Sequence, residues 1–296
     1  MNIKSTVILG LKVLALTILY LIISMISGGL LASGVPQPPE DQMNAVFLGL
    51  ILVAVTESTI VTIIMVRSRW RGWRLALATG FSMFGVMQVM TQVETAYFGP
   101  ALGIPYSMLP ALILPDLATI AVFTPLAVLI LGKRHAPDEV DEQPQRAIMP
   151  RKQWAVKLVA IATIYCVLYF GFGFVIAWTN PELRAAYGGG ADPAFSLYRL
   201  VPFQIFRSAL WVLFALPVIR GTRATTWQLA LLVGFLYSLG MNITLAIPNP
   251  FFTDSMRLSH FIETASSNFI FGLIVTWLVH REHSSLRDLF GIGRAA

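Results

Sequence analysis

Six ionisable side chains lie inside long apolar runs of this sequence, where a charge is costly: Glu57, Glu94, Asp116, Arg207, His260 and Glu263. On insertion scales, a charged side chain at the centre of a bilayer costs ~2.5–3.5 kcal/mol, so such residues usually face a cavity or a partner. Cation binding, proton transfer and buried ion pairing are the chemistry that this set could perform. These residues are therefore the first candidates for a functional site.

Residues 260–268 carry the most informative of these patterns. One helix face there would hold four polar residues at spacings i, i+3, i+4 and i+7: His260, Glu263, Thr264 and Ser267. An imidazole beside a carboxylate can bind a cation, exchange a proton or supply two metal ligands. No companion histidine and no His-Glu-x-x-His motif accompanies this pair. We therefore expect a pH-sensitive binding site without a metal or other cofactor.

A second polar face lies in the run that contains Glu94. Four polar residues surround it: Gln88, Thr91, Gln92 and Thr95. We expect Glu94 and Gln92 to face Asn268 and the pair of His260 and Glu263 across a polar cavity that is open to the outside. The alternative is that the hydroxyls and amides only form hydrogen bonds between helices, as they commonly do in membrane bundles.

Arg207 requires an anionic partner at its own depth. We expect that partner to be Glu57 or Asp116, in a structural or gating ion pair. The alternative is that Arg207 faces the cavity and binds an anionic substrate or a lipid headgroup. Asp116 follows a proline in a run with three prolines, and broken helices at membrane depth are typical of transporter substrate sites. Proline is also simply more frequent in membrane helices.

The elements that must position these residues are membrane-spanning helices. The chain is 56% hydrophobic and 12% charged, against roughly 25% charge in soluble domains. A crossing helix needs ~20 apolar residues, and eight runs qualify: 10–32, 43–66, 74–97, 107–131, 155–178, 200–219, 226–247 and 259–280. The first run is too long for the ~7–15-residue core of a signal peptide, so we interpret it as an uncleaved anchor.

The basic residues between these runs predict the orientation. Of the 21 lysines and arginines, 17 fall in the N-terminal segment and in alternate loops: 67–74, 133–157, 220–223 and 281–294. Positive charge concentrates on the cytoplasmic side of a membrane protein. We therefore expect both termini to lie in the cytoplasm, with the chain in a bacterial-type cytoplasmic membrane.

An internal match predicts a duplication. Residues 73–81 (WRLALATGF) resemble residues 227–235 (WQLALLVGF) at an offset of 154. A unit with an even number of spans duplicates in parallel. The expected organisation is an all-α integral membrane fold of two parallel four-helix repeats. Its segments are a first half 1–132, a cytoplasmic linker 133–153, a second half 154–280 and a cytoplasmic tail 281–296. The longest outer loop, 179–199, is a candidate lid.

These features favour a polytopic membrane protein that binds or transports a small solute, ion or lipid in an outward-facing cavity. One alternative is a membrane enzyme that acts on a lipid, with His260 and Glu263 as general base or metal ligands. The other is an accessory or scaffold subunit that contacts a membrane protein or a second copy of itself. The weakness of every catalytic motif argues against an enzyme, and together with the lack of a soluble domain it favours the scaffold alternative. No basic stripe lies outside the membrane-flanking loops, which argues against nucleic-acid binding.

Overall fold

The described chain consists of helices and connecting loops, and six of its helices are long and apolar enough to cross a membrane. The computed structural model describes residues 3–135, 146–187 and 193–289. The six helices are α1 (Ile3–Leu31), α2 (Met43–Arg67), α5 (Leu109–Ile130), α6 (Arg151–Val175), α8 (Leu197–Gly221) and α10 (Asp254–Val279). They confirm the prediction of an α-helical membrane protein. Parts of the predicted linker, lid and tail lie outside the described residues.

The two other predicted spans are interrupted by wide π-helical turns. The first is continuous through α3 (Gly72–Phe84), the π turn η2 (Gly85–Val89) and α4 (Met90–Phe98). The second comprises α9 (Thr226–Phe235), the π turn η8 (Leu236–Gly240) and a short 3₁₀ turn, η9 (Ile243–Ala246). Such turns are frequent at functional sites. The second segment leaves the helical path before residue 247, so a count of eight spans stays a prediction.

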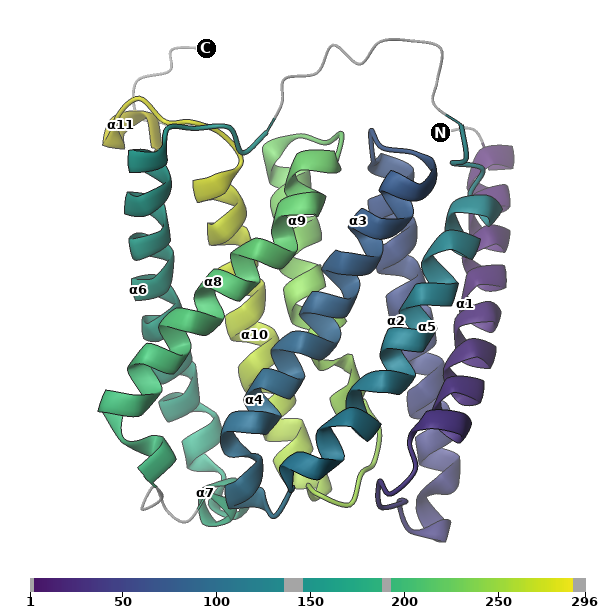
Figure 1. Ribbon diagram of the computed structural model, residues 1–296, viewed down its shortest axis with the longest axis vertical. Coiled ribbons are helices and arrows are strands. Elements are labelled where there is room, and N and C mark those ends of the chain that lie inside the picture. Colours follow the sequence, from purple (N-terminus) through teal and green to yellow (C-terminus); the bar gives the residue numbers. More distant parts are fainter. Residues whose placement is uncertain (1–2, 136–145, 188–192, 290–296) are drawn as a thin grey trace.

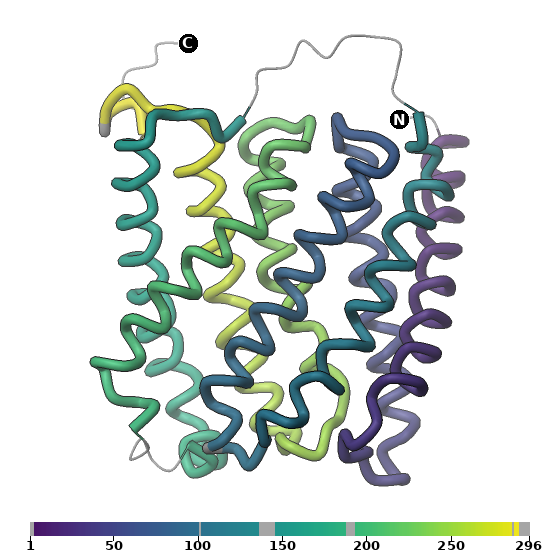
Figure 2. Tube along the Cα trace, in the orientation of Figure 1, coloured from purple at the N-terminus to yellow at the C-terminus, as the bar shows by residue number. Residues whose placement is uncertain are grey.

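The helices form one bundle with both ends of the chain at the same end of it (Figure 1). The short helix α7 (Pro181–Ala186) lies at the opposite end. Helix α1 packs on α2 and α5, whereas α10 packs on α6 and α9. Helix α3 packs on both α5 and α8, and it thereby connects the two groups of helices, as the chain trace in Figure 2 also shows.

Two glycines bring α9 and α10 into backbone contact. A Cβ atom added to Gly272 would lie 2.7 Å from the Cα of Gly234 and 2.8 Å from the carbonyl oxygen of Val233. Membrane helices associate through such close packing at small residues, because lipid supplies no hydrophobic driving force between them. This crossing sets the position of α10, the helix that carries His260 and Glu263.

The chain that follows α10 is attached to the start of α6. The Nζ of Lys157 donates to the carbonyl of Arg281 and lies 2.8 Å from the Nδ1 of His283. Arg281 makes a bidentate ion pair with Asp288, at 2.8 and 2.9 Å. Burial, reinforced by the positive charge of Lys157, lowers the pKa of His283 to about 4. His283 is therefore neutral at pH 7, and its Nδ1 accepts the hydrogen bond from Lys157.

We predict that Gly272→Ala destabilises the protein by ~1–3 kcal/mol, the usual cost of overpacking. The reason is that the atoms in its way belong to the backbone and have no rotamer to change. The melting temperature of the purified protein in mild detergent measures the effect. Gly171→Ala is the matched control, because a Cβ on Gly171 meets nothing within 4 Å. Equal melting temperatures for the two variants would contradict the close crossing.

A second prediction concerns how pH affects the attachment of the segment that follows α10. Lowering the pH from ~6.5, the ordinary histidine pKa, towards about 4 should loosen the attached tail. In this window the unfolded chain binds a proton at His283 that the folded chain does not, so stability falls as the pH falls. Hydrogen exchange of residues 284–289 measures the change. His283→Asn keeps an acceptor for Lys157 but does not titrate, so its pH dependence should be smaller; an unchanged profile contradicts the assignment.

Candidate functional site

Glu94, His260 and Glu263 lie around one cavity of about 290 Å³. The cavity is enclosed by the ends of α4 and α6, by α7 and by the beginning of α8 and α10, at the end of the bundle opposite the termini. Its volume is near the lower limit of small-molecule sites, ~300–1,000 Å³. The structure thus brings together the three residues that the sequence singled out, whereas their role in binding stays a prediction.

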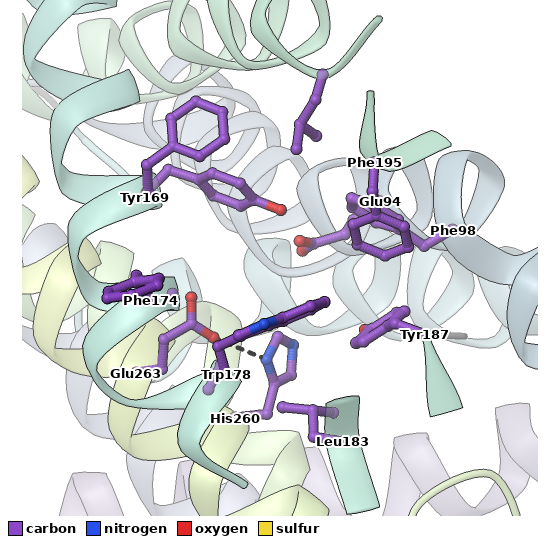
Figure 3. A pocket seen from close by; sticks show the side chains of 14 residues that line it. Glu94, Phe98, Tyr169, Phe174, Trp178, Leu183, Tyr187, Phe195, His260 and Glu263 are labelled. Atoms are coloured by element: carbon purple, nitrogen blue, oxygen red, sulfur yellow. Dashed lines mark hydrogen bonds and ion pairs between the residues drawn. The ribbon is translucent and has the colours of Figure 1, made fainter. Parts of the chain in front are cut away.

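The pair of His260 and Glu263 forms the polar wall on α10. The Nδ1 of His260 lies 3.0 Å from the Oε2 of Glu263, as Figure 3 shows, and both side chains are largely buried. The spacing i, i+3 places them side by side, and Thr253 caps the helix about two turns before His260 by accepting from the amide of Met256. On α6, Gly173 lies beside the same carboxylate, since a Cβ on it would be at an ordinary contact distance of 3.7 Å from Glu263 Oε1.

Glu94 enters the cavity from the side opposite Glu263 (Figure 3) and is paired with Arg207. The guanidinium donates to both carboxylate oxygens, at 3.0 and 3.2 Å, and to Gln204 Oε1 at 3.1 Å. It also lies over the rings of Tyr165 and Phe203. The prediction that Arg207 pairs with Glu57 or Asp116 is therefore wrong. Depth along the membrane normal suggested those partners, but α8 contacts α4, and the long arginine side chain spans the difference in depth.

Aromatic rings form most of the remaining wall, and the sequence analysis missed them. Seven of the fourteen lining residues are aromatic: Phe98, Tyr169, Phe170, Phe174, Trp178, Tyr187 and Phe195. Phe170, Phe174 and Trp178 are spaced i, i+4 and i+8 along α6 and the turn after it. This spacing was the feature of the sequence that could have predicted an aromatic face. The centroid of the Phe195 ring lies 5.2 Å from Phe98 and 5.1 Å from Tyr187. These contacts attach the outer loop to α4.

The other predicted site residues do not line this cavity. Asn268 and Arg207 border a smaller neighbouring cavity of about 10 Å³, which Glu94 and Glu263 also reach. Gln92 donates to Gln88 at 3.2 Å, and Gln88 in turn donates to Asp116 on α5. Glu57 is fully buried in α2, and neither of its carboxylate oxygens has a hydrogen-bond partner in the described chain. Thus Gln92, Asp116 and Glu57 lie outside the cavity that Glu94, His260 and Glu263 line.

The hydroxyls of the two polar faces bond within their own helices. Thr91 donates to the carbonyl of Met87 at 2.6 Å, and Thr95 donates to that of Thr91 at 3.0 Å. Thr264 donates to the carbonyl of His260 at 2.6 Å. These hydroxyls therefore form no hydrogen bond between helices, so that expectation is wrong for them, whereas Thr264 and Ser267 do border the smaller cavity beside Glu263. The physical reason is that a threonine on a helix can satisfy its hydroxyl locally.

The site consists of carboxylates, one imidazole and aromatic faces. Among the described residues, no group of three His, Cys, Asp or Glu side chains is placed to hold a metal ion. The outer loop adds Tyr187, whose phenol has a raised pKa because it is buried, so the ring is neutral at pH 7. What this arrangement can do chemically is hold a compact ligand between a charged wall and an aromatic wall.

The fold and the site together define the class: an α-helical membrane protein with a buried carboxylate–imidazole pair in a solute-sized cavity. Comparison of the chain with protein-family models, with curated proteins and with solved structures finds no match.

We predict that removing either partner of the buried ion pair destabilises the fold far more than removing both. Glu94→Gln or Arg207→Met leaves one charge buried alone, which costs ~3–5 kcal/mol. The double variant should recover much of this loss. Melting temperatures in detergent test the prediction. Asp254→Asn is the control, since Asp254 is 88% exposed in its pair with Arg257 and such pairs contribute ~0–1 kcal/mol. Additive losses in the double variant would show that the two residues act independently.

Proposed function

We propose that this protein binds a small solute in the cavity beside Glu94, His260 and Glu263 and transports it across the membrane. The observation that carries the proposal is the convergence of two carboxylates and an imidazole on one aromatic-lined cavity of about 290 Å³. Ionisable residues at membrane depth are costly, and they mark substrate or ion pathways in membrane proteins. Glu263 would hold the charged part of the solute, and His260 would adjust the charge of that carboxylate.

We infer that the cavity opens to the outer face of a bacterial-type cytoplasmic membrane. Basic side chains gather at the end of the bundle where the termini lie. There Lys133 donates to the carbonyl of Val66 at 2.9 Å, and Arg220 donates to that of Ala147. Positive residues favour the cytoplasmic side. With eight crossings, both termini would be cytoplasmic and the cavity would face outward.

The proposal includes an internal duplication into two parallel four-helix halves. Helices α2 and α8 occupy 43–67 and 197–221, which correspond residue for residue at the offset of 154. The amide of Arg69 donates to Gly221 at 2.7 Å, and the amide of Arg223 donates to Arg67 at 2.6 Å. The donors Arg69 and Arg223 are 154 residues apart, and so are the acceptors Arg67 and Gly221. This reciprocity supports a pseudo-two-fold axis along the membrane normal, an arrangement found in transporters.

A second candidate function is lipid hydrolysis or transfer at the outer leaflet. The observation that favours it is the 3.0 Å contact between His260 and Glu263, because a carboxylate can orient an imidazole as a general base. However, the residues that line the cavity include no serine, threonine or cysteine to act as a nucleophile. A scaffold subunit, the third alternative, would not require a cavity with buried carboxylates. Transport is therefore the function that we propose.

Cysteine accessibility tests the proposal. We predict that Ala177→Cys, in a Cys166→Ser background, reacts with a membrane-impermeant thiol reagent from the outside, because Ala177 lines the cavity. A transporter that alternates between two faces should also react, more slowly, in inside-out vesicles. Ala230→Cys, at a position that is 1% exposed in α9, is the unreactive control.

Each outcome distinguishes the candidates. Modification of Ala177→Cys from the outside alone supports a fixed site, as in an enzyme, and contradicts transport. Modification from the inside alone overturns the proposed orientation. Complete protection from both sides overturns the proposed solvent-connected cavity.

A further inference from the structure

The cavity carries one uncompensated negative charge when the imidazole of His260 is unprotonated. The bidentate contact with Arg207 neutralises Glu94, and the guanidinium is 3% exposed and therefore held in place. The hydrogen-bond partner of Glu263 in the described chain is His260, which is neutral whenever its imidazole is unprotonated. Among the described residues, no lysine or arginine side chain lines the cavity to balance Glu263. The site is thus suited to a ligand with a single positive charge.

The aromatic wall specifies the kind of cation further. The faces of Phe, Tyr and Trp rings attract cations electrostatically, most strongly where water is excluded, and they hold ammonium ions that have no N–H group to donate. In Figure 3 the rings of Tyr169, Phe174 and Trp178 lie on the same side of the cavity as Glu263, and Tyr187 and Phe195 close the other side. An inorganic cation would gain little from these apolar faces, because it needs oxygen ligands.

We propose that the ligand of this cavity is a small organic cation, a quaternary ammonium or an alkylamine of comparable size. Its charged nitrogen would lie beside Glu263, and its alkyl groups would contact Trp178 and the rings around it. The cavity of about 290 Å³ accommodates a compact molecule of this kind. This inference rests on the proposed function, since it names the class of solute that the same site would bind.

Acid should weaken binding, because protonation of His260 would cancel the charge of Glu263. The ionisable groups that face this pair from the packed elements are Glu94 of α4, Arg207 of α8, Tyr165 and Tyr169 of α6 and Tyr187 beyond α7. Glu94 and Arg207 remain paired with each other, and the phenols stay neutral. His260 is therefore the group of this set that contacts Glu263 directly and whose protonation would cancel its charge.

Thermal stabilisation by defined probes tests the inference. We expect choline and tetraethylammonium to raise the melting temperature of the purified protein in detergent. The control probe is 3,3-dimethyl-1-butanol, which has the shape of choline but carries no charge, and it should give no shift; sodium chloride at equal ionic strength controls for salt. Equal stabilisation by the neutral alcohol would show a purely apolar pocket and overturn the proposal. The absence of any shift with either cation would overturn it as well.

Matched variants assign the two parts of the site. Trp178→Leu should weaken choline binding ~3- to 30-fold, the range for loss of one desolvated cation–π contact, and Glu263→Gln should abolish the preference for choline over the alcohol. Trp277→Leu is the control, because Trp277 lies at the other end of α10 and donates to Leu289. Each variant is first shown to have an unchanged elution volume and circular dichroism spectrum. Binding that is unaffected by both site variants would place the cation elsewhere.

A kinetic measurement separates failure of this inference from failure of the proposed function. Ala177→Cys should react ~10-fold or more faster with a trimethylammonium methanethiosulfonate than with a sulfonate one, after correction for their rates with a free thiol. Glu263→Gln should remove this preference. If the residue reacts from both sides of the membrane without any charge preference, the cavity and transport stand but the organic cation is wrong. If it does not react at all, the solvent-connected cavity is wrong, and the proposed function is overturned together with this inference.

Discussion

The buried ion pair between Glu94 and Arg207 is the interaction on which the rest of the site depends. It joins α4 to α8, and its guanidinium lies over the ring of Tyr165 on α6. A buried ion pair adds little net stability, but it fixes which groups must stay together, because either charge alone would be costly. By neutralising Glu94 it also leaves the charge of the cavity to Glu263 and His260. The position of one arginine therefore determines both the contact of α4 with α8 and the electrostatics of the site.

Local patterns in the sequence predicted what depends on local spacing. Hydropathy located the crossing helices, and the i, i+3 spacing brought His260 and Glu263 together. The sequence could not predict which helices contact one another sideways. It gave the depth of Arg207 along the membrane normal, but depth does not tell which helix lies beside that residue. The aromatic wall was missed for a related reason. Aromatic residues have the same spacing along a membrane helix whether they face lipid or a cavity, so the spacing alone does not tell the two apart. The π turns depend on backbone hydrogen bonding, which side-chain pattern alone does not specify.

Close packing of small residues explains how such a polar site can exist in an apolar bundle. The contact of Gly234 with Gly272 brings α9 against α10. Gly85, at the end of α3, leaves room for the ring of Phe214 on α8, because a Cβ there would overlap that ring. At the end of the bundle that holds the cavity, aromatic side chains line the open space instead. The site is thus supported by rigid helix crossings, while the loop with α7 and Phe195 covers it.

Under the proposed duplication, the two halves keep the same packing but differ in what they bury. Tyr20 packs on Phe123 at 5.1 Å in the first half, and Tyr165 packs on Phe271 at 4.7 Å in the second. The residue that corresponds to Glu57 at the offset of 154 is Trp211, whose indole donates to Tyr165. The second half thus places a neutral donor where the first has a buried carboxylate. Its own carboxylate, Glu263, lies further out on α10, beside the cavity. Under this duplication the cavity is asymmetric, because His260, Glu263 and most of the aromatic wall come from the second half, whereas the first contributes Glu94 and Phe98.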